Sequence, residues 1–236
     1  MTTYKSIVGQ KIQKVSSDPT NPLIGQIWYN TSLGSLKGRK FTAAAWASGG
    51  NLDTARFTLA GCGTQTAGLA FGGNARPPTN NPVGLTEEYN GSTWSEQNTL
   101  GTARESICGA GTQTAAVGFG GYVSPGGASA LTEEYDGTSW TASNNMGTAR
   151  YSLAGSGIQT AALAFGGSPT TGATEQYDGT SWTTSTSMTT ARRALASANA
   201  SPSTSSLAFG GFSTANVATT EEFTGEVTAS VTITTS

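Results

Sequence analysis

The chain has 236 residues, of which 36% are hydrophobic and only 11% are charged, and it contains 32 glycines and no histidine. This composition suits short strands joined by tight turns better than helices rich in Leu, Glu and Lys, so it predicts an all-β protein. The lack of histidine removes the commonest general base and the commonest metal ligand, which argues against an enzyme and predicts neither a metal site nor a cofactor.

Charge divides the chain near residue 40. Residues 1–40 hold six cations and one carboxylate, Asp18, for a net charge of +5, whereas residues 41–236 have a net charge of −7. We therefore expect an N-terminal attachment or oligomerisation segment over residues 1–40 and a separate β domain over residues 41–236. The cations are scattered among apolar residues and the larger part would repel phosphate, so no nucleic-acid partner is expected. No apolar stretch is long enough for a signal peptide or a membrane span, so we expect cytoplasmic synthesis without membrane insertion.

Residues 21–37 have the pattern of a β-hairpin. A run that contains Gly25-Gln26-Ile27-Trp28-Tyr29-Asn30-Thr31 leads through a turn ending at Gly34 into Ser35-Leu36-Lys37. These residues resemble a motif common in bacteriophage tail-fibre and virion-associated proteins, in which Gly-x-x-Trp-Tyr-Asn-Thr precedes Gly-x-Leu-Lys. The resemblance implies that residues 1–40 bind other virion proteins or form a homo-oligomer, with a trimer favoured, and that Trp28 and Tyr29 are apolar anchors. The alternative is a small hairpin packed on the β domain itself.

Four sequence anchors recur in a fixed order beyond residue 41. A Trp is followed ten residues later by an Arg, then by Phe-Gly-Gly, and then by an acidic pair with an aromatic residue. The tryptophans are Trp46, Trp94, Trp140 and Trp182, the arginines are Arg56, Arg104, Arg150 and Arg192, the Phe-Gly-Gly triplets begin at Phe71, Phe119, Phe165 and Phe209, and the acidic triplets begin at Glu87, Glu133, Glu175 and Glu221. The spacing of about 42 to 48 residues is close to that of propeller blades.

The link from each aromatic residue to the next Trp predicts a tight turn. It contains Asn90-Gly91, Asp136-Gly137 or Asp178-Gly179. Asn-Gly and Asp-Gly between β-rich runs are typical of two-residue type I′ turns, in which both central residues have positive φ. We therefore expect the Tyr and Trp strands to be paired neighbours.

The order of these anchors resembles the kelch repeat, and the resemblance implies a four-repeat kelch-like β-propeller over residues 41–236. The last copy has no Trp after Phe223, whereas Trp46 stands before the first Arg. A strand around Trp46 is therefore expected to complete the last blade and close the ring. The alternative is an open array that other subunits complete, which would leave strand edges exposed.

The repeated charged residues admit a functional and a structural interpretation. Arg56 and its three equivalents form either a cluster that binds an anionic sugar or a set of guanidinium groups that tie the fold together, and their invariant spacing favours the second. Glu87 and its equivalents are expected to pair with these arginines, because a glycoside hydrolase would need one carboxylate pair to differ from the others. Cys62 and Cys108 are expected to be small buried residues, with a disulfide left open.

The loops after Phe-Gly-Gly differ most in length, and they include residues 74–82 and 122–127. Binding usually occurs on such loops, so the candidate ligand contacts are Arg76, Asn80, Asn81 and Tyr122. With the resemblances above, these features predict a virion structural protein of a bacteriophage, a tail-fibre or fibre-tip protein that binds a glycan or protein on the host surface. The alternatives are a capsid decoration or tail structural protein without a receptor, and an intracellular adaptor.

Overall fold

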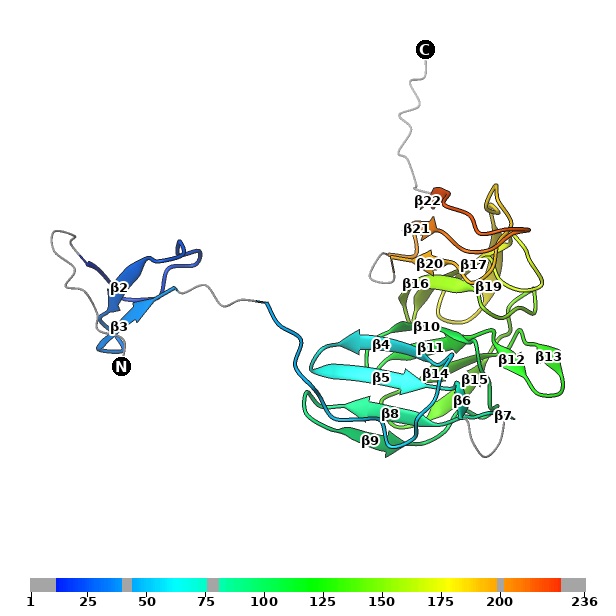
Figure 1. Cartoon of the computed structure of the whole chain (residues 1–236), viewed down its shortest axis with the longest axis horizontal. Helices are drawn as coiled ribbons and strands as arrows, with labels where there is room; N and C mark the ends of the chain where they lie inside the picture. Colours follow the sequence, from blue (N-terminus) through cyan, green and yellow to red (C-terminus); the bar gives the residue numbers. More distant parts are fainter. Residues whose placement is uncertain (1–11, 40–43, 76–80, 199–201, 226–236) are drawn as a thin grey trace, which may run out of the picture. The chain divides into compact units, whose positions relative to one another are not determined.

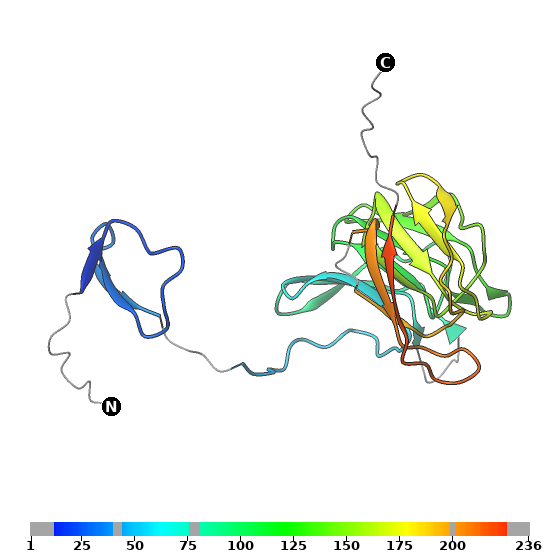
Figure 2. The same cartoon turned by 90° about the horizontal axis from the view of Figure 1, so that it is seen from above.

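We describe a computed structural model of the chain over residues 12–39, 44–75, 81–198 and 202–225. All regular secondary structure in these residues is β-strand, with no helix, which confirms the prediction of an all-β protein (Figures 1 and 2). The chain forms two compact units, residues 1–48 and residues 49–236. We call them the N-terminal unit and the sheet array, and each is described by itself.

The N-terminal unit contains a three-stranded sheet. Its strands are β1 (Gln13–Val15), β2 (Ile27–Asn30) and β3 (Ser35–Gly38). β2 and β3 are antiparallel, with Tyr29 opposite Leu36, which confirms the hairpin predicted over residues 21–37. β1 pairs in parallel with β2 and was not predicted.

The sheet array contains one antiparallel sheet for each copy of the repeat. The first sheet consists of β4 (Ala60–Thr64), β5 (Ala67–Phe71), β8 (Thr86–Tyr89) and β9 (Trp94–Gln97). The second consists of β10 (Cys108–Gly111), β11 (Ala116–Phe119), β14 (Thr132–Tyr135) and β15 (Trp140–Ser143). The third consists of β16 (Ala154–Ile158), β17 (Ala161–Phe165), β18 (Thr174–Tyr177) and β19 (Trp182–Ser185). In the described residues the fourth has three strands, β20 (Ala196–Ser197), β21 (Ser205–Phe209) and β22 (Thr220–Thr224).

Two short hairpins project from the loops after Phe-Gly-Gly. They are formed by β6 (Asn74–Ala75) with β7 (Asn81–Pro82), and by β12 (Tyr122–Val123) with β13 (Gly127–Ala128). The first strands of the four sheets, β4, β10, β16 and β20, pack side by side in that order. A cavity of about 300 Å³ is lined by residues at or next to all four of these strands, among them Leu59, Cys108, Leu153 and Ala196.

Successive sheets are joined by the same backbone hydrogen bond. Two residues after each repeated Arg the backbone has a positive φ, between 50° and 52°, at Thr58, Ser106, Ser152 and Ala194. The N–H of this residue donates to the carbonyl oxygen of its equivalent in the preceding copy, from Ser106 to Thr58, from Ser152 to Ser106 and from Ala194 to Ser152, over 2.8 to 2.9 Å. The three joints therefore have one local geometry.

The glycine pairs belong to the same joints. Gly120 has a φ of +65°, and a Cβ on it would lie 2.7 Å from the carbonyl oxygen of Arg150 in the next copy. The N–H of Gly121, the second glycine, donates to that same oxygen over 2.9 Å. Both the left-handed backbone and the close approach require glycine. This explains why Phe-Gly-Gly recurs where one sheet meets the next.

The hairpin turns differ from the prediction. Tyr89 is paired with Trp94, as expected, and the equivalent pairs form in the second and third sheets. Gly91 has a positive φ, but Asn90 does not, so the turn is not type I′. The Asn90 Oδ1 accepts hydrogen bonds from the N–H groups of Ser92 and Thr93, both over 2.9 Å. The side chain thereby stabilises a longer turn, which is the other common use of Asn and Asp at such positions.

The closing strand expected around Trp46 is absent from the described residues. Residues 44–50 form no strand, the side chain of Trp46 is fully exposed, and β22 pairs only with β21. The other three tryptophans follow their partner strand through a tight turn. Trp46 has no such neighbour in the sequence, because its expected partner lies at the far end of the repeats.

Substitution of the first glycine of a triplet tests the joint. We expect Gly210→Ala to lower the free energy of unfolding by about 1 kcal/mol, the cost of a left-handed conformation with a side chain. No atom lies closer than 3.9 Å to a Cβ at Gly210, whose φ is +64°. Gly120→Ala carries the same backbone cost and a clash with Arg150, so we expect a loss of about 2 to 4 kcal/mol. Urea denaturation of the two variants at low protein concentration measures the difference. Equal losses would show that the contact with Arg150 does not matter.

Candidate functional site

Each repeated arginine forms a buried ion pair with the first acid of its own copy. The Nη2 to Oε1 distances are 3.0 Å for Arg56 and Glu87, 2.8 Å for Arg104 and Glu133, 2.9 Å for Arg150 and Glu175, and 3.1 Å for Arg192 and Glu221. The arginine side chains have no exposed surface, and the first three glutamates are at most 6% exposed. A dissolved sugar cannot reach these groups in this arrangement. The structural interpretation of the arginines and of their glutamates is confirmed.

The second copy shows how each pair organises its surroundings. Arg104 Nη1 donates to the carbonyl oxygens of Gly120 and Leu131 over 2.8 and 2.7 Å. The other carboxylate oxygen of Glu133 accepts the N–H of Gly101 over 2.6 Å, which ties the loop before the arginine to the third strand. Burial lowers the pKa of Arg104, and the Glu133 carboxylate opposes that shift. Arginine stays charged in proteins, so the pair is a permanent cross-link within its sheet.

In the first two copies the second acid, Glu88 or Glu134, serves the joint to the next sheet. Tyr135 Oη donates to Glu88 Oε1 over 2.9 Å, and Tyr177 Oη donates to Glu134 Oε1 over 2.7 Å. Desolvation, together with the Glu134 carboxylate, raises the pKa of Tyr177 to about 12. These carboxylates therefore act as hydrogen-bond acceptors between sheets.

The two cysteines are free thiols. Desolvation raises the pKa of both Cys62 and Cys108 to about 12. A thiol with such a pKa is almost entirely protonated at neutral pH and is a poor nucleophile. They are thus half-buried, unreactive side chains of the first strands of their sheets.

A set of variable residues forms paired positions that we call the rim. In each copy, the residue after the repeated Arg forms a β-bridge with the residue after the glycine pair. The rim residues are Phe57 with Asn74, Glu105 with Tyr122, Tyr151 with Ser168, and Arg193 with Phe212. No two pairs are alike, although both members of each pair directly follow an invariant residue, the repeated Arg or the second glycine of Phe-Gly-Gly.

Contacts between pairs connect the rim across the joints. Asn74 Nδ2 donates to Glu105 Oε2 over 2.9 Å, so the first pair meets the second. The rings of Tyr122 and Tyr151 pack edge to face with centroids 5.5 Å apart, so the second pair meets the third. Arg193 lies over the ring of Phe212 at 5.0 Å. The rim therefore presents aromatic rings, one carboxylate and one guanidinium along the array.

The loop residues predicted from sequence fall partly on this rim. Tyr122 is a rim residue and is half-buried, and Asn81 is exposed on β7. Arg76 and Asn80 lie outside the described residues. Sequence reasoning missed Tyr151, Arg193 and Phe212, although a signal was available. The position after each invariant Arg holds Phe, Glu, Tyr or Arg, and such variation beside a fixed residue marks a position that the repeated contacts do not constrain.

In the N-terminal unit, Trp28 and Tyr29 lie on opposite faces of the sheet. Trp28 is 6% exposed, and its Nε1 donates to Asp18 Oδ1 over 3.0 Å. Asn30 Nδ2 and Lys37 Nζ also donate to the Asp18 carboxylate, over 2.8 and 2.6 Å. These three donors hold the pKa of Asp18 at about 2, with Lys37 the largest cause. Trp28 is thus part of the core of its own unit and not an exposed anchor.

The opposite face of this sheet is apolar and open. Side chains alternate between faces along a strand, so Tyr29 shares its face with Ile27 and with Leu36, its cross-strand neighbour. Ile27 is 36% and Leu36 58% exposed, and Tyr29 is half-buried. Leu23, Ile24 and Leu33 of the same unit are also exposed. This face, defined by Ile27, Tyr29 and Leu36, is the attachment candidate of the unit.

Within the described ranges, no cluster of three or more acidic, cysteine or histidine side chains could hold a metal ion. The same residues contain no helix of the length and apolar character needed to cross a membrane. Comparisons with models of known protein families and with curated proteins find no match. The functional assignment therefore depends on the geometry above.

Removal of a buried guanidinium tests its structural role. We expect Arg150→Ala to lower the free energy of unfolding by about 3 to 5 kcal/mol, because it leaves the buried Glu175 without its charge partner. Arg193→Ala is a matched control on the rim and is expected to cost less than about 1 kcal/mol, the value of an exposed cation–π contact. Thermal or urea denaturation followed by circular dichroism measures both. Similar stabilities for the two variants would contradict the structural role of Arg150.

The Asp18 cluster predicts a pH dependence at the low end. The folded pKa of Asp18, about 2, lies below the unperturbed value of about 3.9. Its stabilisation is therefore complete above about pH 4 and is lost as the pH falls through 2. In the NMR spectrum, we expect the Trp28 indole N–H signal to titrate with a midpoint near pH 2 and Asp18→Asn to abolish that titration. A midpoint near pH 4 would show that the cluster does not form in solution.

Proposed function

We propose that the chain is a structural protein of a bacteriophage virion, a tail-fibre or fibre-tip protein in which a kelch-like β-propeller array binds a glycan or protein on the host surface. The rim is the observation that carries this proposal. A binding protein that reuses one scaffold keeps its structural contacts constant and varies the side chains offered to the ligand. The four copies have this division, with invariant arginines and glycines inside and unlike side chains along the rim.

The chemistry of the rim supports recognition rather than catalysis. Tyr122, Tyr151 and Phe212 offer rings of the kind enriched at binding hot spots, and Glu105 and Arg193 offer charge. The first acid of each pair is committed to an arginine, and the second acids Glu88 and Glu134 are committed to tyrosines. A glycoside hydrolase would require carboxylates free to meet the substrate.

The N-terminal unit supports the attachment half of the proposal. An isolated sheet of three short strands has little core of its own, and here it leaves Ile27, Tyr29 and Leu36 on one open face. Exposed apolar faces of this kind occur where another protein binds. The proposed partners are other virion proteins, and the proposed location is the virion.

A deletion tests the proposed attachment by the N-terminal unit, and a substitution tests the proposed receptor binding by the rim. We expect a chain without residues 1–40 to keep a folded sheet array but to be missing from purified particles. We expect Arg193→Ala to leave incorporation unchanged and to slow adsorption of particles to host cells at least tenfold, which corresponds to about 1.4 kcal/mol. Electron cryomicroscopy of particles and adsorption rates are the measurements.

Thr183→Ala is the matched control for the rim, because Thr183 is exposed on β19 away from the rim residues. It should change neither incorporation nor adsorption. Normal adsorption by Arg193→Ala and by Tyr151→Ala would favour the alternative, a capsid decoration or tail protein without a receptor. Normal incorporation of the deletion would show that the sheet array makes the virion contact.

A further inference from the structure

The joints between sheets contain a tryptophan from the later sheet. In the first joint, the ring of Trp140 on β15 packs against Phe71 of the preceding sheet, with centroids 4.8 Å apart. The Trp140 Nε1 also donates to Thr86 Oγ1 over 2.8 Å. Trp182 makes the same two contacts in the second joint, at 5.0 and 2.8 Å. The indole therefore fills a defined place between one sheet and the next.

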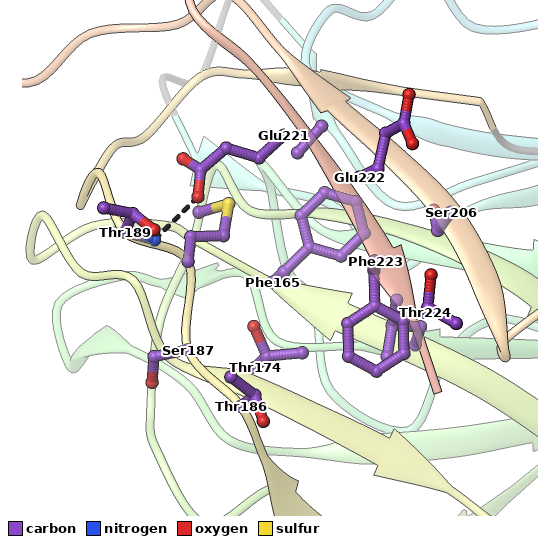
Figure 3. A pocket seen from close by; sticks show the side chains of 13 residues that line it. Phe165, Thr174, Thr186, Ser187, Thr189, Ser206, Glu221, Glu222, Phe223 and Thr224 are labelled. Atoms are coloured by element: carbon purple, nitrogen blue, oxygen red, sulfur yellow. Dashed lines mark hydrogen bonds between the residues drawn. The ribbon is translucent and has the colours of Figure 1, made fainter. Parts of the chain in front are cut away.

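The third joint has a cavity at this place. The residues equivalent to Phe71 and Thr86 in the third sheet are Phe165 and Thr174, and both line a cavity of about 260 Å³ between the third and fourth sheets (Figure 3). Phe223 and Thr224 of β22 line its other side. The fourth sheet has no strand after β22 in the described residues, so no tryptophan enters.

One tryptophan has the spacing that this position requires. Trp46 precedes Arg56 by ten residues, as the other three tryptophans precede their arginines. Its side chain is fully exposed. Four residues later, the N–H of Gly50 donates to the Ser92 carbonyl oxygen over 3.1 Å, in the position that Asn98 and Asn144 occupy against the turns of the second and third sheets. Gly50 therefore meets the turn of the first sheet as the residue after the last strand of a preceding sheet would.

The two ends of the array also carry complementary groups. Glu88 and Glu134 each accept a hydrogen bond from the tyrosine of the next copy. In the third joint both members are replaced, by Gln176 and Phe223. Glu222 on the last sheet and Tyr89 on the first sheet nevertheless retain the original types, although Glu222 has no tyrosine of a following copy, and Tyr89 no acid of a preceding copy, among the four copies. Joining the last sheet to a first sheet would pair them.

The fourth and first sheets also carry apolar side chains that would pack against each other in such a joint. Phe209 is the last of the four repeated phenylalanines and is 39% exposed, whereas Phe71, Phe119 and Phe165 are at most 3% exposed. The first sheet offers Trp94, whose equivalents Trp140 and Trp182 cover Phe71 and Phe119. A last-to-first joint would place Trp94 over Phe209.

The partner is a second chain because the three internal joints have one geometry. Each adds a sheet through the same hydrogen bond between residues with positive φ, from Ser106 to Thr58 and onward. After three such steps the ends are not joined within the described part of the array, because the Thr58 N–H makes no bond to the Ala194 carbonyl. Closure within one chain would require the array to change its geometry. A second chain can instead dock its first sheet on the fourth sheet with the geometry that the three internal joints already have.

We infer that a second copy of this chain docks its first sheet on the fourth sheet and inserts its residues 46–49 beside β22, with Trp46 in the cavity lined by Phe165 and Thr174. Within the described residues, the site beside β22 is incomplete without the partner copy. The joint is heterologous, so repetition builds a ring if its rotation closes. This inference does not depend on the proposed function, because it uses only contacts of the repeated joint.

The strand register of the repeated sheets predicts which residues of the two chains lie opposite each other, and a disulfide cross-link can test this. Tyr177 pairs with Trp182 and Gln176 with Thr183 in the third sheet, so in the new joint Phe223 pairs with Trp46 and Glu222 with Ala47. In a background in which Cys62 and Cys108 are replaced by Ala, chains carrying Ala47→Cys are mixed with chains carrying Glu222→Cys and oxidised. We expect a disulfide-linked pair of chains, because such cross-strand positions suit disulfide geometry.

The pair Gln176→Cys and Thr183→Cys in one chain is the matched control and should form an internal bond. A chain that carries both Ala47→Cys and Glu222→Cys distinguishes the two topologies. Linked oligomers support the inference. A bond only within single chains, with none in the mixture, would overturn it in favour of ring closure by the chain's own Trp46. No bond in either case, with the control bonded, would also overturn it.

Removal of the Trp46 indole provides a second test. We expect Trp46→Ala to weaken association at least tenfold in sedimentation velocity over a concentration series, without changing the melting temperature of the dilute chain. Leu33→Ala removes another exposed apolar side chain, at 64% exposure, and should leave association unchanged. Equal association of wild type and Trp46→Ala would overturn the inference.

Discussion

A buried arginine in each copy holds the array together. In the second copy, the guanidinium of Arg104 donates to the carbonyl oxygens of Gly120 and Leu131 and to the carboxylate of Glu133 on the third strand. The carbonyl oxygen of Arg104 accepts a hydrogen bond from Gly73 of the preceding sheet. One residue thus closes the sheet to which it belongs and fixes the next sheet to it. A charge that is taken out of water needs a partner of opposite charge, since an unpaired buried charge is strongly destabilising. The repetition of the arginine therefore explains why the glycines and acids recur with it.

The parts of the fold that the sequence predicted are those with short range or strict repetition. The Tyr and Trp strands pair because only a few residues separate them, and Arg150 meets Glu175 because every copy keeps both. The turn type was wrong because Asp and Asn have two uses near a glycine, and the choice depends on whether their side chains find backbone N–H groups. The pairing of Glu88 with Tyr135 lies across a joint, so no pattern within one copy predicts it.

The site residues were harder to predict for a related reason. Trp28 was expected as an anchor on the strength of its residue type, but Asp18 lies ten residues away in sequence and covers its face of the sheet. Which face of a short strand is buried depends on a segment outside the strand. The rim was only half recognised, because loop length drew the prediction to residues 74–82 and 122–127. The positions after Arg150 and Arg192 reach the same rim without any insertion.

The third joint lacks contacts that the first two joints share, and this links the stability of the fourth sheet to assembly. It lacks the tyrosine-to-carboxylate bond and the indole, and Glu221 is 23% exposed where the other three glutamates are at most 6%. In a linear array each sheet is stabilised by its neighbours, so the last sheet has the least support. A ligand that binds only the ordered form stabilises it by mass action. A second chain that fills the cavity and pairs with β22 would act as such a ligand, so the fourth sheet gains stability as the chains associate. The departures of the last copy from the repeat then have a common explanation. The partner chain supplies the missing indole, whereas the carboxylate and the tyrosine of the third joint are both replaced, by Gln176 and Phe223.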